Sequence, residues 1–367
     1  MIPNVYHSEI EEISEKFQPK KRASIFLSQS FNRLGYETKF NRIKDCGSYL
    51  IFAHELYDDG MINPEGLLYK ANFCKDRLCP MCAWRRSLKL YGQISVIADN
   101  LEGKYEYLFL TLTVPSVGDD DLMKTIEDMT SAYNRMFRRS IFKGGKRDPQ
   151  IVYGSLRVLE ITRNNITGLW HPHFHVILAV CKDYFSGRKY IRQGIYQKIW
   201  TECYCDISGY QLKSGLKGLI VDIRKTYGLN EDEYDCVYES GIREAAKYSV
   251  KSCDYLHYDD LDLTDHIVEF LSSILYHKRM IQFMGVFKDE FDREGFEDIC
   301  EDDGDLVRFN HKFNPLVSHF VQEFGFGVYG YSLIRNYVML PDTENQHAER
   351  DDINNFINKE IKKNGKR

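Results

Sequence analysis

Residues 171–180 carry the stretch His171-Pro-His-Phe-His-Val-Ile-Leu-Ala-Val180, in which three imidazoles occupy every second position of an apolar run. Side chains of a β-strand alternate between the two faces of its sheet, so His171, His173 and His175 share one face. Pro172 cannot donate to a sheet ladder, which predicts a position at the start of the strand or on an edge. One histidine would be ordinary on a half-exposed surface, but three in register favour metal ligands or catalytic bases. The opposite face is apolar: Phe174, Val176, Leu178 and Val180.

A second strand, predicted over residues 153–163, is joined to the histidine strand by Asn164-Asn-Ile-Thr-Gly-Leu169. Asn and Gly in so short a connection indicate a hairpin. With its centre near Ile166 and Thr167, Glu160 lies across from His173, and cross-strand Cβ atoms are roughly 4.5 to 5.5 Å apart.

The hairpin therefore predicts that Glu160, His173 and His175 bind a divalent cation that acts as a Lewis acid. Manganese or magnesium is the first choice for this site, and zinc is the second. His171 stays open as an alternative third ligand or as a residue that supports the ligands.

Chain length and composition narrow the class of protein. A length of 367 residues predicts about two domains and ample material for a hydrophobic core. The first 17 residues are too acidic for a secretory signal, and no run approaches the roughly 18 apolar residues of a membrane span. We therefore expect a cytoplasmic protein without membrane contact.

A net charge of −5 does not exclude nucleic acid as a partner, because a local basic face is sufficient. Residues 133–147 are basic and interleaved with aromatic side chains, although such a stretch is most often a solvated helix face. Residues 289–305 are strongly acidic and predict a surface loop or linker. The weak candidates for DNA binding are Arg135, Arg138, Arg139 and Lys247.

In a reducing compartment the ten cysteines are expected to be thiols or metal ligands. Cys79 and Cys82 form a tight knuckle, Cys74 lies five residues earlier, and Cys46 lies well upstream. Four sulfurs close a tetrahedral structural zinc site, which contributes on the order of 10 kcal/mol or more to folding. Cys46 is the least secure of the four ligands, and His54 is its alternative.

A third constellation is Glu244-Ala-Ala-Lys-Tyr-Ser-Val-Lys251, predicted to be helical. Residues three and four apart share a helix face, which would align Glu244, Tyr248 and Lys251. A tyrosine hydroxyl becomes a nucleophile when a cation or base assists it. The chain has 25 tyrosines, and spacing alone does not select Tyr248 over Tyr255.

These segments predict an α+β fold in four parts. Residues 1–45 form a helical segment, residues 46–97 a cysteine module that ends in a helix, residues 98–256 the domain with the histidine hairpin, and residues 257–367 a mixed region that is a candidate for DNA or partner contact. Further predictions are strands at 107–114 and 218–224 and helices at 119–142, 190–204 and 241–251. No G-x-x-x-x-G-K-S/T phosphate loop occurs, so ATP hydrolysis is not expected.

The order of three motifs, Phe109-Leu-Thr-Leu-Thr-Val-Pro115, then His171-Pro-His-Phe-His175, then residues 244–251, resembles the signature of plasmid rolling-circle replication initiators of the HUH endonuclease superfamily. The segment Asn72-Phe-Cys-Lys-Asp-Arg-Leu-Cys-Pro-Met-Cys-Ala-Trp-Arg-Arg86 resembles the cysteine module of the Gram-positive plasmid branch. This resemblance implies a central antiparallel sheet flanked by helices, a ferredoxin-like core, with a small zinc module.

The resemblance also implies a reaction, site-specific nicking of one DNA strand at the double-strand origin. His173 and His175 would hold the metal, Tyr248 would form a 5′-phosphotyrosyl link, Glu244 would act as general base in the terminating cleavage, and Lys251 would orient the tyrosine or stabilise its charge. The implied partners are origin DNA, as a single-stranded or hairpin nick site, and the host's helicase and polymerase. Dimerisation on DNA is left open.

Three alternatives remain from the sequence. The histidine run also fits histidine-triad nucleotide hydrolases, although these are short proteins without a partner tyrosine or a cysteine module. A non-enzymatic, zinc-containing DNA-binding repressor would bind DNA without cutting it. A transposase would use the same chemistry on a different sequence.

Overall fold

The computed structural model of the chain describes residues 10–11, 13–57, 59–145, 149–186, 188–215, 217–226, 251–276, 278–298, 304–307 and 313–341. The chain divides into two compact units. The first consists of residues 1–21, 46–72 and 307–367, and the second of residues 22–45 and 73–306. The units therefore cut across the four consecutive parts expected from the sequence, since residues 46–97 contribute to both. No described helix has both the length and the apolar character that a bilayer span requires.

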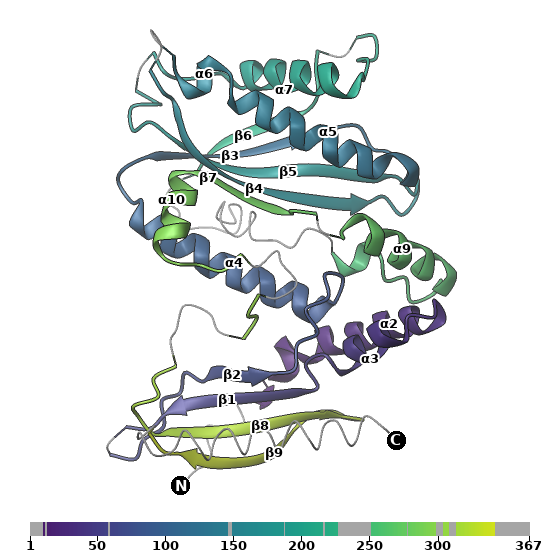
Figure 1. The fold of residues 1–367 in the computed structure, drawn as a ribbon, viewed down its shortest axis with the longest axis vertical. Coiled ribbons are helices and arrows are strands. Elements are labelled where there is room, and N and C mark those ends of the chain that lie inside the picture. Colours follow the sequence, from purple (N-terminus) through teal and green to yellow (C-terminus); the bar gives the residue numbers. More distant parts are fainter. Residues whose placement is uncertain are drawn as a thin grey trace. The chain divides into compact units, whose positions relative to one another are not determined.

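The first unit is built on a four-stranded antiparallel sheet in the order β2 (Leu67–Ala71), β1 (Tyr49–Glu55), β8 (His319–Gly327), β9 (Gly330–Met339) (Figure 1). Ile51, Ala53 and Val321 form the centre of its small apolar cluster. Glu323 on β8 is buried and accepts two hydrogen bonds, of 2.7 and 2.9 Å, from the guanidinium of Arg335 on β9. The pairing of β1 with β8 thus joins segments that are distant in the sequence.

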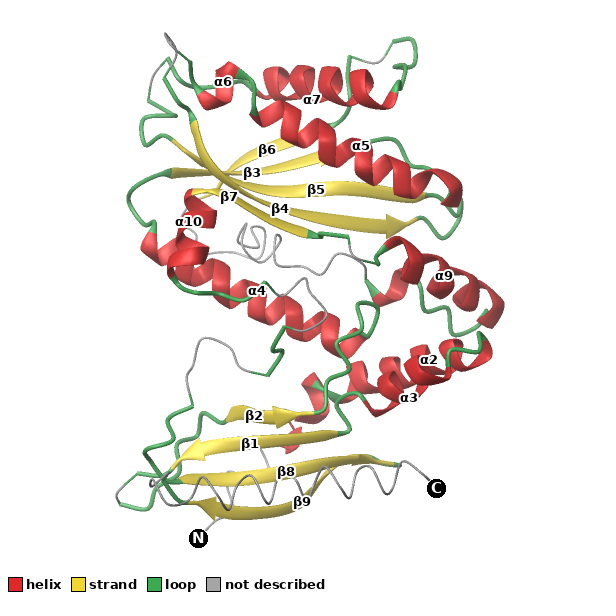
Figure 2. Cartoon of the chain, in the orientation of Figure 1, coloured by secondary structure: helices red, strands yellow, loops and turns green. Residues whose placement is uncertain are grey.

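The second unit contains a five-stranded antiparallel sheet in the order β6 (Val221–Thr226), β3 (Glu106–Thr113), β5 (Trp170–Val180), β4 (Val152–Arg163), β7 (Ile281–Gly285). Helices α5 (Asp119–Phe137) and α7 (Gln193–Ser208) cover one face, and α4 (Pro80–Asn100) and α10 (Val286–Arg293) cover the other (Figure 2). The remaining elements are α2 (Gln18–Arg33), which begins in the first unit, α3 (Glu37–Asp45), α6 (Ser140–Lys143), the short helix η1 (Ser252–Asp254) and α9 (Leu261–Ile274).

Strand β5 lies in the middle of this sheet and is covered on both faces. Phe174 packs against Tyr133 of α5 and Trp200 of α7, with ring centroids 5.8 and 6.5 Å apart. Ile177 and Ala179 point to the other face and belong to the apolar cluster formed with α4 and α10. The predicted alternation is therefore correct, and the histidines share their face with a second apolar layer. Pro172 is the third residue of β5 and lies just before the start of pairing with β3 at His173, as expected for a residue without an amide donor.

The α+β class with antiparallel sheets flanked by helices is confirmed, while several local predictions need correction. The helix predicted over 119–142 ends at Phe137, and a short second helix, α6, follows. The acidic run was expected to be a loop or linker, but its first residues form the end of α10. There Glu290 is buried and paired with Arg293, because Phe287 and Phe291 on the same helix pack into the core.

The helix predicted over 241–251 lies outside the described residues except for Lys251. Lys251 has an extended backbone, with φ −80° and ψ 142°, and precedes η1. Its assignment to that helix is therefore wrong. The local reason is that Lys251 is the N-cap of the next helical turn, and N-cap residues adopt the β region.

We predict that Phe174→Ala lowers the free energy of unfolding by about 3–5 kcal/mol, because a fully buried ring is replaced by a cavity. Urea unfolding monitored by circular dichroism measures this change. Ile166→Ala is the control, since Ile166 is 96% exposed and its truncation is expected to cost no more than about 0.5 kcal/mol. Equal effects of the two changes would show that Phe174 is not a core residue.

Candidate metal centre

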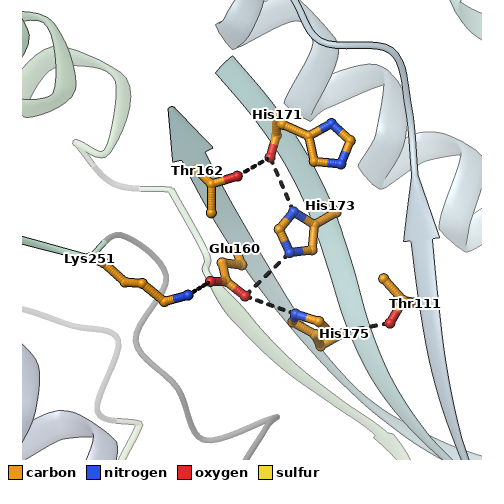
Figure 3. Close-up of polar contacts among 7 residues, drawn as sticks. All are labelled: Thr111, Glu160, Thr162, His171, His173, His175 and Lys251. Atoms are coloured by element: carbon orange, nitrogen blue, oxygen red, sulfur yellow. Dashed lines mark hydrogen bonds and ion pairs between the residues drawn. The ribbon is translucent and has the colours of Figure 1, made fainter. Parts of the chain in front are cut away.

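Glu160 on β4 and the two histidines on β5 meet on the face of the sheet that α4 covers. Glu160 pairs in register with His173, which confirms the register predicted from the hairpin turn. One carboxylate oxygen, Oε2, lies 2.8 Å from Nε2 of His175 and 3.3 Å from Nε2 of His173 (Figure 3). All three side chains are buried. The three residues thus form a group whose potential ligand atoms lie within 4.8 Å of one another.

The outward-facing nitrogens of the two imidazoles determine which lone pairs point inward. Nδ1 of His173 lies 3.1 Å from the carbonyl oxygen of His171, which can only accept, so this nitrogen carries the hydrogen. Nδ1 of His175 lies 3.4 Å from the hydroxyl of Thr111 on β3. With Nδ1–H turned outward, the lone pair of His173 Nε2 would be available to a cation, whereas direct hydrogen bonding to the Glu160 carboxylate requires a hydrogen on Nε2 as well. Several acceptors converging on one point fit a bound cation, and such outer contacts are the usual support of metal-binding histidines.

The Glu160 carboxyl is held in its charged form. Burial alone would raise its pKa, but the contacts with His173, His175 and Lys251 outweigh burial and hold the pKa well below its usual range. The ammonium of Lys251 lies 2.9 Å from Oε1, the oxygen that the histidines leave open. Each oxygen of this carboxylate therefore has its own partner, with Lys251 on one and the imidazoles on the other.

His171 lies beside this group rather than in it. Its ring stacks on that of His173 with centroids 5.3 Å apart, and its Nδ1 is 3.4 Å from the hydroxyl of Ser116. Burial, followed by the charge of His173, lowers the pKa of His171. The geometry therefore groups Glu160, not His171, with the other two histidines, although which of them serves as third ligand stays a prediction.

The predicted cysteine group is also present. Cys46, Cys74, Cys79 and Cys82 are buried, and their sulfurs lie within 4.8 Å of one another. His54, the alternative to Cys46, is not in this group, and its Nδ1 lies 2.9 Å from the carbonyl oxygen of Asn63. Four sulfurs at this spacing are a donor set suited to structural zinc.

Local structure explains how the cysteines come together. Cys46 directly follows the end of α3, and Cys79 is the N-cap of α4, with Pro80 as the first helical residue. The Lys75 amide donates to Cys82 Sγ at 3.1 Å. Cys79 and Cys82 both lie at the N-terminal end of α4, where the helix dipole favours thiolates.

Tyr255 is part of the fold around the cysteine loop. It is 1% exposed, and its hydroxyl donates to the carbonyl of Leu78. Arg77 in the same loop donates to the carbonyls of Leu275 and Lys278, both at 2.6 Å. Tyr255, which the sequence could not separate from Tyr248, is thus engaged as a core residue.

The remaining predicted site residues divide into two sets. Tyr248, Glu244 and Lys247 lie outside the described residues. Arg135 and Arg139 contact Asp206 and Glu202 of α7 at 2.8 and 3.7 Å. These arginines, with Arg138, therefore lie on the α5–α7 side of the sheet, opposite the Glu160 group, and their role in DNA binding stays a prediction.

Comparison with known proteins gives the family. The family model described as "Replication protein" matches residues 65–323, which include the histidine hairpin and three of the four grouped cysteines. The chain belongs to this replication protein family. The match confirms the expected relationship to replication proteins.

Curated members of the replication protein family align over most of the chain. "Protein rep" of Streptococcus pneumoniae serotype 2 (strain D39 / NCTC 7466) is 34% identical, with 78% of this chain and 82% of the relative aligned. "Protein rep" of a Bacillus species is 32% identical over 77% and 88% of the two chains. "Protein rep" of Bacillus amyloliquefaciens is 30% identical over 87% and 92%. No solved structure matches the chain.

Sequence reasoning missed two contacts in this member of the replication protein family. The contact of Thr111, on the strand predicted over 107–114, with His175 was not foreseen. A hydroxyl in the middle of an apolar strand is a usable signal, because Thr111 pairs in register with His175. The contact of Lys251 with Glu160 had no local signal, since the two residues lie far apart in the sequence.

We predict that Glu160→Ala weakens Mn²⁺ binding at least about 100-fold, because it removes the only anionic ligand of the group, whereas His171→Ala weakens it less than about 10-fold. Isothermal titration calorimetry on the purified chain measures both constants. Unchanged circular dichroism spectra would show that both variants are folded. A loss confined to His171→Ala would overturn the assignment of Glu160.

We predict one tightly bound zinc per chain and its loss in Cys82→Ser, because a tetrahedral site needs all four donors. Losing the zinc is expected to remove on the order of 10 kcal/mol, enough to prevent stable folding. Elemental analysis and thermal unfolding measure the two effects. The matched control is Cys205→Ser on α7, a cysteine outside the group, which should keep both zinc and stability. Full zinc content in Cys82→Ser would contradict the assignment.

Proposed function

We propose that the protein initiates rolling-circle replication of a plasmid by nicking one DNA strand at the origin, through a covalent link to Tyr248, and rejoins strands after a round. The observation that carries the proposal is the Glu160, His173 and His175 group, with Lys251 in contact with its carboxylate. The order of the three sequence motifs and the membership of the replication protein family support it independently.

Glu160, His173 and His175 would hold a divalent cation, Mn²⁺ or Mg²⁺. Such an ion supplies Lewis-acid polarisation of a phosphate oxygen and neutralises charge that develops on it. The donor set fits this cation class, because two imidazoles and one carboxylate leave coordination positions open to water or substrate. The rigid hairpin of β4 and β5 fixes the relative positions of the three side chains.

Lys251 contacts the proposed cation site and is close in sequence to the proposed nucleophile, Tyr248. Its ammonium lies 2.9 Å from Glu160, and Tyr248 precedes it by only three residues. Three residues span at most about 11 Å of fully extended chain, so the Cα of Tyr248 is covalently restricted to the neighbourhood of Lys251. A cation near the phenol also favours its ionised form, which is the nucleophilic one.

The proposed first step is a phosphoryl transfer. The Tyr248 oxygen forms a bond to the scissile phosphorus while the bond from phosphorus to the 3′ oxygen breaks. The phenol proton passes to a base, and the leaving 3′ oxygen takes up a proton to become a 3′-hydroxyl, which the host polymerase extends. The phosphate remains attached to the tyrosine as a 5′-phosphodiester.

Termination requires a second cleavage, for which Glu244 is proposed as general base for water. Strand rejoining is the reverse transfer, in which a 3′-hydroxyl attacks the phosphotyrosine and releases the phenol. Because the sequence lacks an ATP-binding phosphate loop, unwinding is assigned to a host helicase. The proposed DNA substrate is the origin in single-stranded or hairpin form.

The deciding experiment incubates the purified protein with supercoiled plasmid carrying its own origin and Mn²⁺. We expect relaxed circles with protein attached to the 5′ end, and mass spectrometry of the adduct should identify the Tyr248 peptide. Tyr248→Phe should abolish the product. Tyr255→Phe is the matched control, because that hydroxyl is buried in a structural hydrogen bond, and it should still nick.

Two outcomes would replace the proposal. DNA binding without scission under Mn²⁺, Mg²⁺ or Zn²⁺ would indicate a repressor. Phosphate-ester cleavage that survives chelation and Tyr248→Phe, but not His173→Ala or His175→Ala, would indicate a histidine nucleophile.

A further inference from the structure

The loop that joins β5 to α7, residues 181–192, exposes two aromatic rings side by side. Phe185 is 38% exposed and Tyr190 is 53% exposed, and their ring centroids lie 6.4 Å apart. Large aromatic side chains are usually buried, because they remove much apolar area from water. Two neighbouring rings that stay partly in water therefore indicate a surface that contacts another molecule.

A buried tyrosine holds this loop in place. Tyr184 is 1% exposed, and its hydroxyl donates to the carbonyl of Ile191 at 3.0 Å and accepts from the amide of the same residue at 3.3 Å. The hydroxyl of Tyr196 on α7 lies 3.2 Å away. The ring of Tyr184 also contacts those of Phe185 and Tyr190, with centroids 5.0 and 5.5 Å apart. The exposed rings thus have a fixed support, which lowers the entropic cost of using them for binding.

The loop and the start of α7 carry an excess of positive charge. Residues 181–198 contain five basic side chains and one acidic side chain, Asp183, which pairs with Lys189 at 2.8 Å. Three exposed cations of this segment have no ion-pair partner in the part of the chain that the structure describes: Lys182, Arg188 and Arg192. Their charge is therefore available to an anionic ligand.

These cations lie beside the exposed rings. Each of the three is only two or three residues from Phe185 or Tyr190, which limits the separation of their Cα atoms to about 11 Å. A further cation comes from β6, where Nζ of Lys225 lies 4.4 Å from the ring centroid of Phe185. Lys225 also pairs with Glu106 at 3.2 Å, so it adds less net charge than the other three.

We propose that the β5–α7 loop binds single-stranded DNA, with bases stacked on Phe185 and Tyr190 and the exposed cations in contact with the phosphates. Exposed rings next to positive charge are the combination that holds single strands without sequence preference. Duplex DNA fits less well, because its base faces are already stacked on one another. A protein partner also fits less well, because the buried centres of protein interfaces are depleted of charged residues. Membership of the replication protein family favours DNA over RNA.

The position of the loop separates this contact from the Glu160 group. His173 and Val180 lie seven positions apart on β5, and a strand rises about 3.3 Å per residue. The loop therefore begins roughly 23 Å along the strand from the proposed cation site. It would hold a part of the strand away from the reacting phosphate. The proposal goes beyond the proposed nicking function and requires neither the metal nor Tyr248.

The test measures, by fluorescence anisotropy in EDTA, how tightly the full-length protein binds a thymidine oligonucleotide of about 16 nucleotides. Phe185→Ala/Tyr190→Ala should weaken binding roughly tenfold or more, since each stacked base contributes about that much. Tyr190→Phe should bind as the wild-type protein does, because the ring rather than the hydroxyl stacks. The matched control is Tyr276→Ala, which removes a tyrosine that is 67% exposed outside the loop and should leave the affinity unchanged.

Salt dependence tests the cations separately from the rings. Lys182→Gln/Arg192→Gln should reduce the slope of log affinity against log salt by about 1.4, because each phosphate contact on a single strand contributes about 0.7. Lys213→Gln/Lys217→Gln removes the same charge from exposed positions outside the loop and should leave the slope unchanged.

Photo-crosslinking gives a readout that a general loss of stability would not mimic. An oligonucleotide with halogenated uracil bases should crosslink to peptides that contain Phe185 or Tyr190, as identified by mass spectrometry. Crosslinks confined to other peptides, or unchanged affinity in the double alanine variant, would overturn the proposal. An equal loss of affinity for a blunt duplex of the same length would do so too, because stacking on the rings needs unpaired bases.

The outcomes of this test and of the nicking assay are independent. The binding measurements contain no divalent metal and no origin sequence, so a failure of nicking leaves them unaffected. Conversely, if the β5–α7 loop does not bind single strands, relaxed circles linked to Tyr248 are still expected.

Discussion

The buried charge of Glu160 is the constraint around which the second unit is organised. A carboxylate removed from water is costly unless partners surround it. Here two imidazoles and an ammonium converge on it from β5 and from the segment after residue 250. Without its imidazole and ammonium partners, the buried charge of Glu160 would be uncompensated. The β4–β5 hairpin and the contact with Lys251 therefore depend on one another. The apolar layers on both faces of β5 exclude the water that would otherwise weaken these contacts.

The parts of this centre that could be predicted are those that depend on local rules. A turn centred near Ile166 and Thr167 fixes the register of β4 against β5, and from that register Glu160 lies across from His173. Likewise, the tight spacing of Cys79 and Cys82 at the start of a helix was sufficient to suggest a metal knuckle. In both cases the relevant residues lie within about a dozen positions of one another, so strand alternation and helix capping determine their geometry.

What could not be predicted depends on contacts between distant segments. Nothing in the sequence of residues 49–55 indicates that they pair with residues 319–327, because both are short apolar strands that could join any sheet edge. The acidic run was misread for a related reason. Its charge suggested a loop, while Phe287 and Phe291, spaced one helical turn apart, pack α10 onto the sheet and outweigh the solvent preference of its neighbours. The ion pair of Lys251 with Glu160 was likewise not predictable, because the two residues lie far apart in the sequence.

The first unit is built from segments that are far apart in the sequence, and this affects how the chain folds during its synthesis. The chain leaves this unit at residue 72 and returns at residue 307. In its sheet, β1 pairs with β8, and these are the two central strands. During synthesis, β1 and β2 therefore lack their partner strand β8 while more than half of the polypeptide is translated. An isolated two-stranded hairpin is only marginally stable in water. A chain that ends between β5 and β8 would contain the histidine hairpin but could not complete this sheet. Both sheets can therefore form only after the chain has been translated through β9.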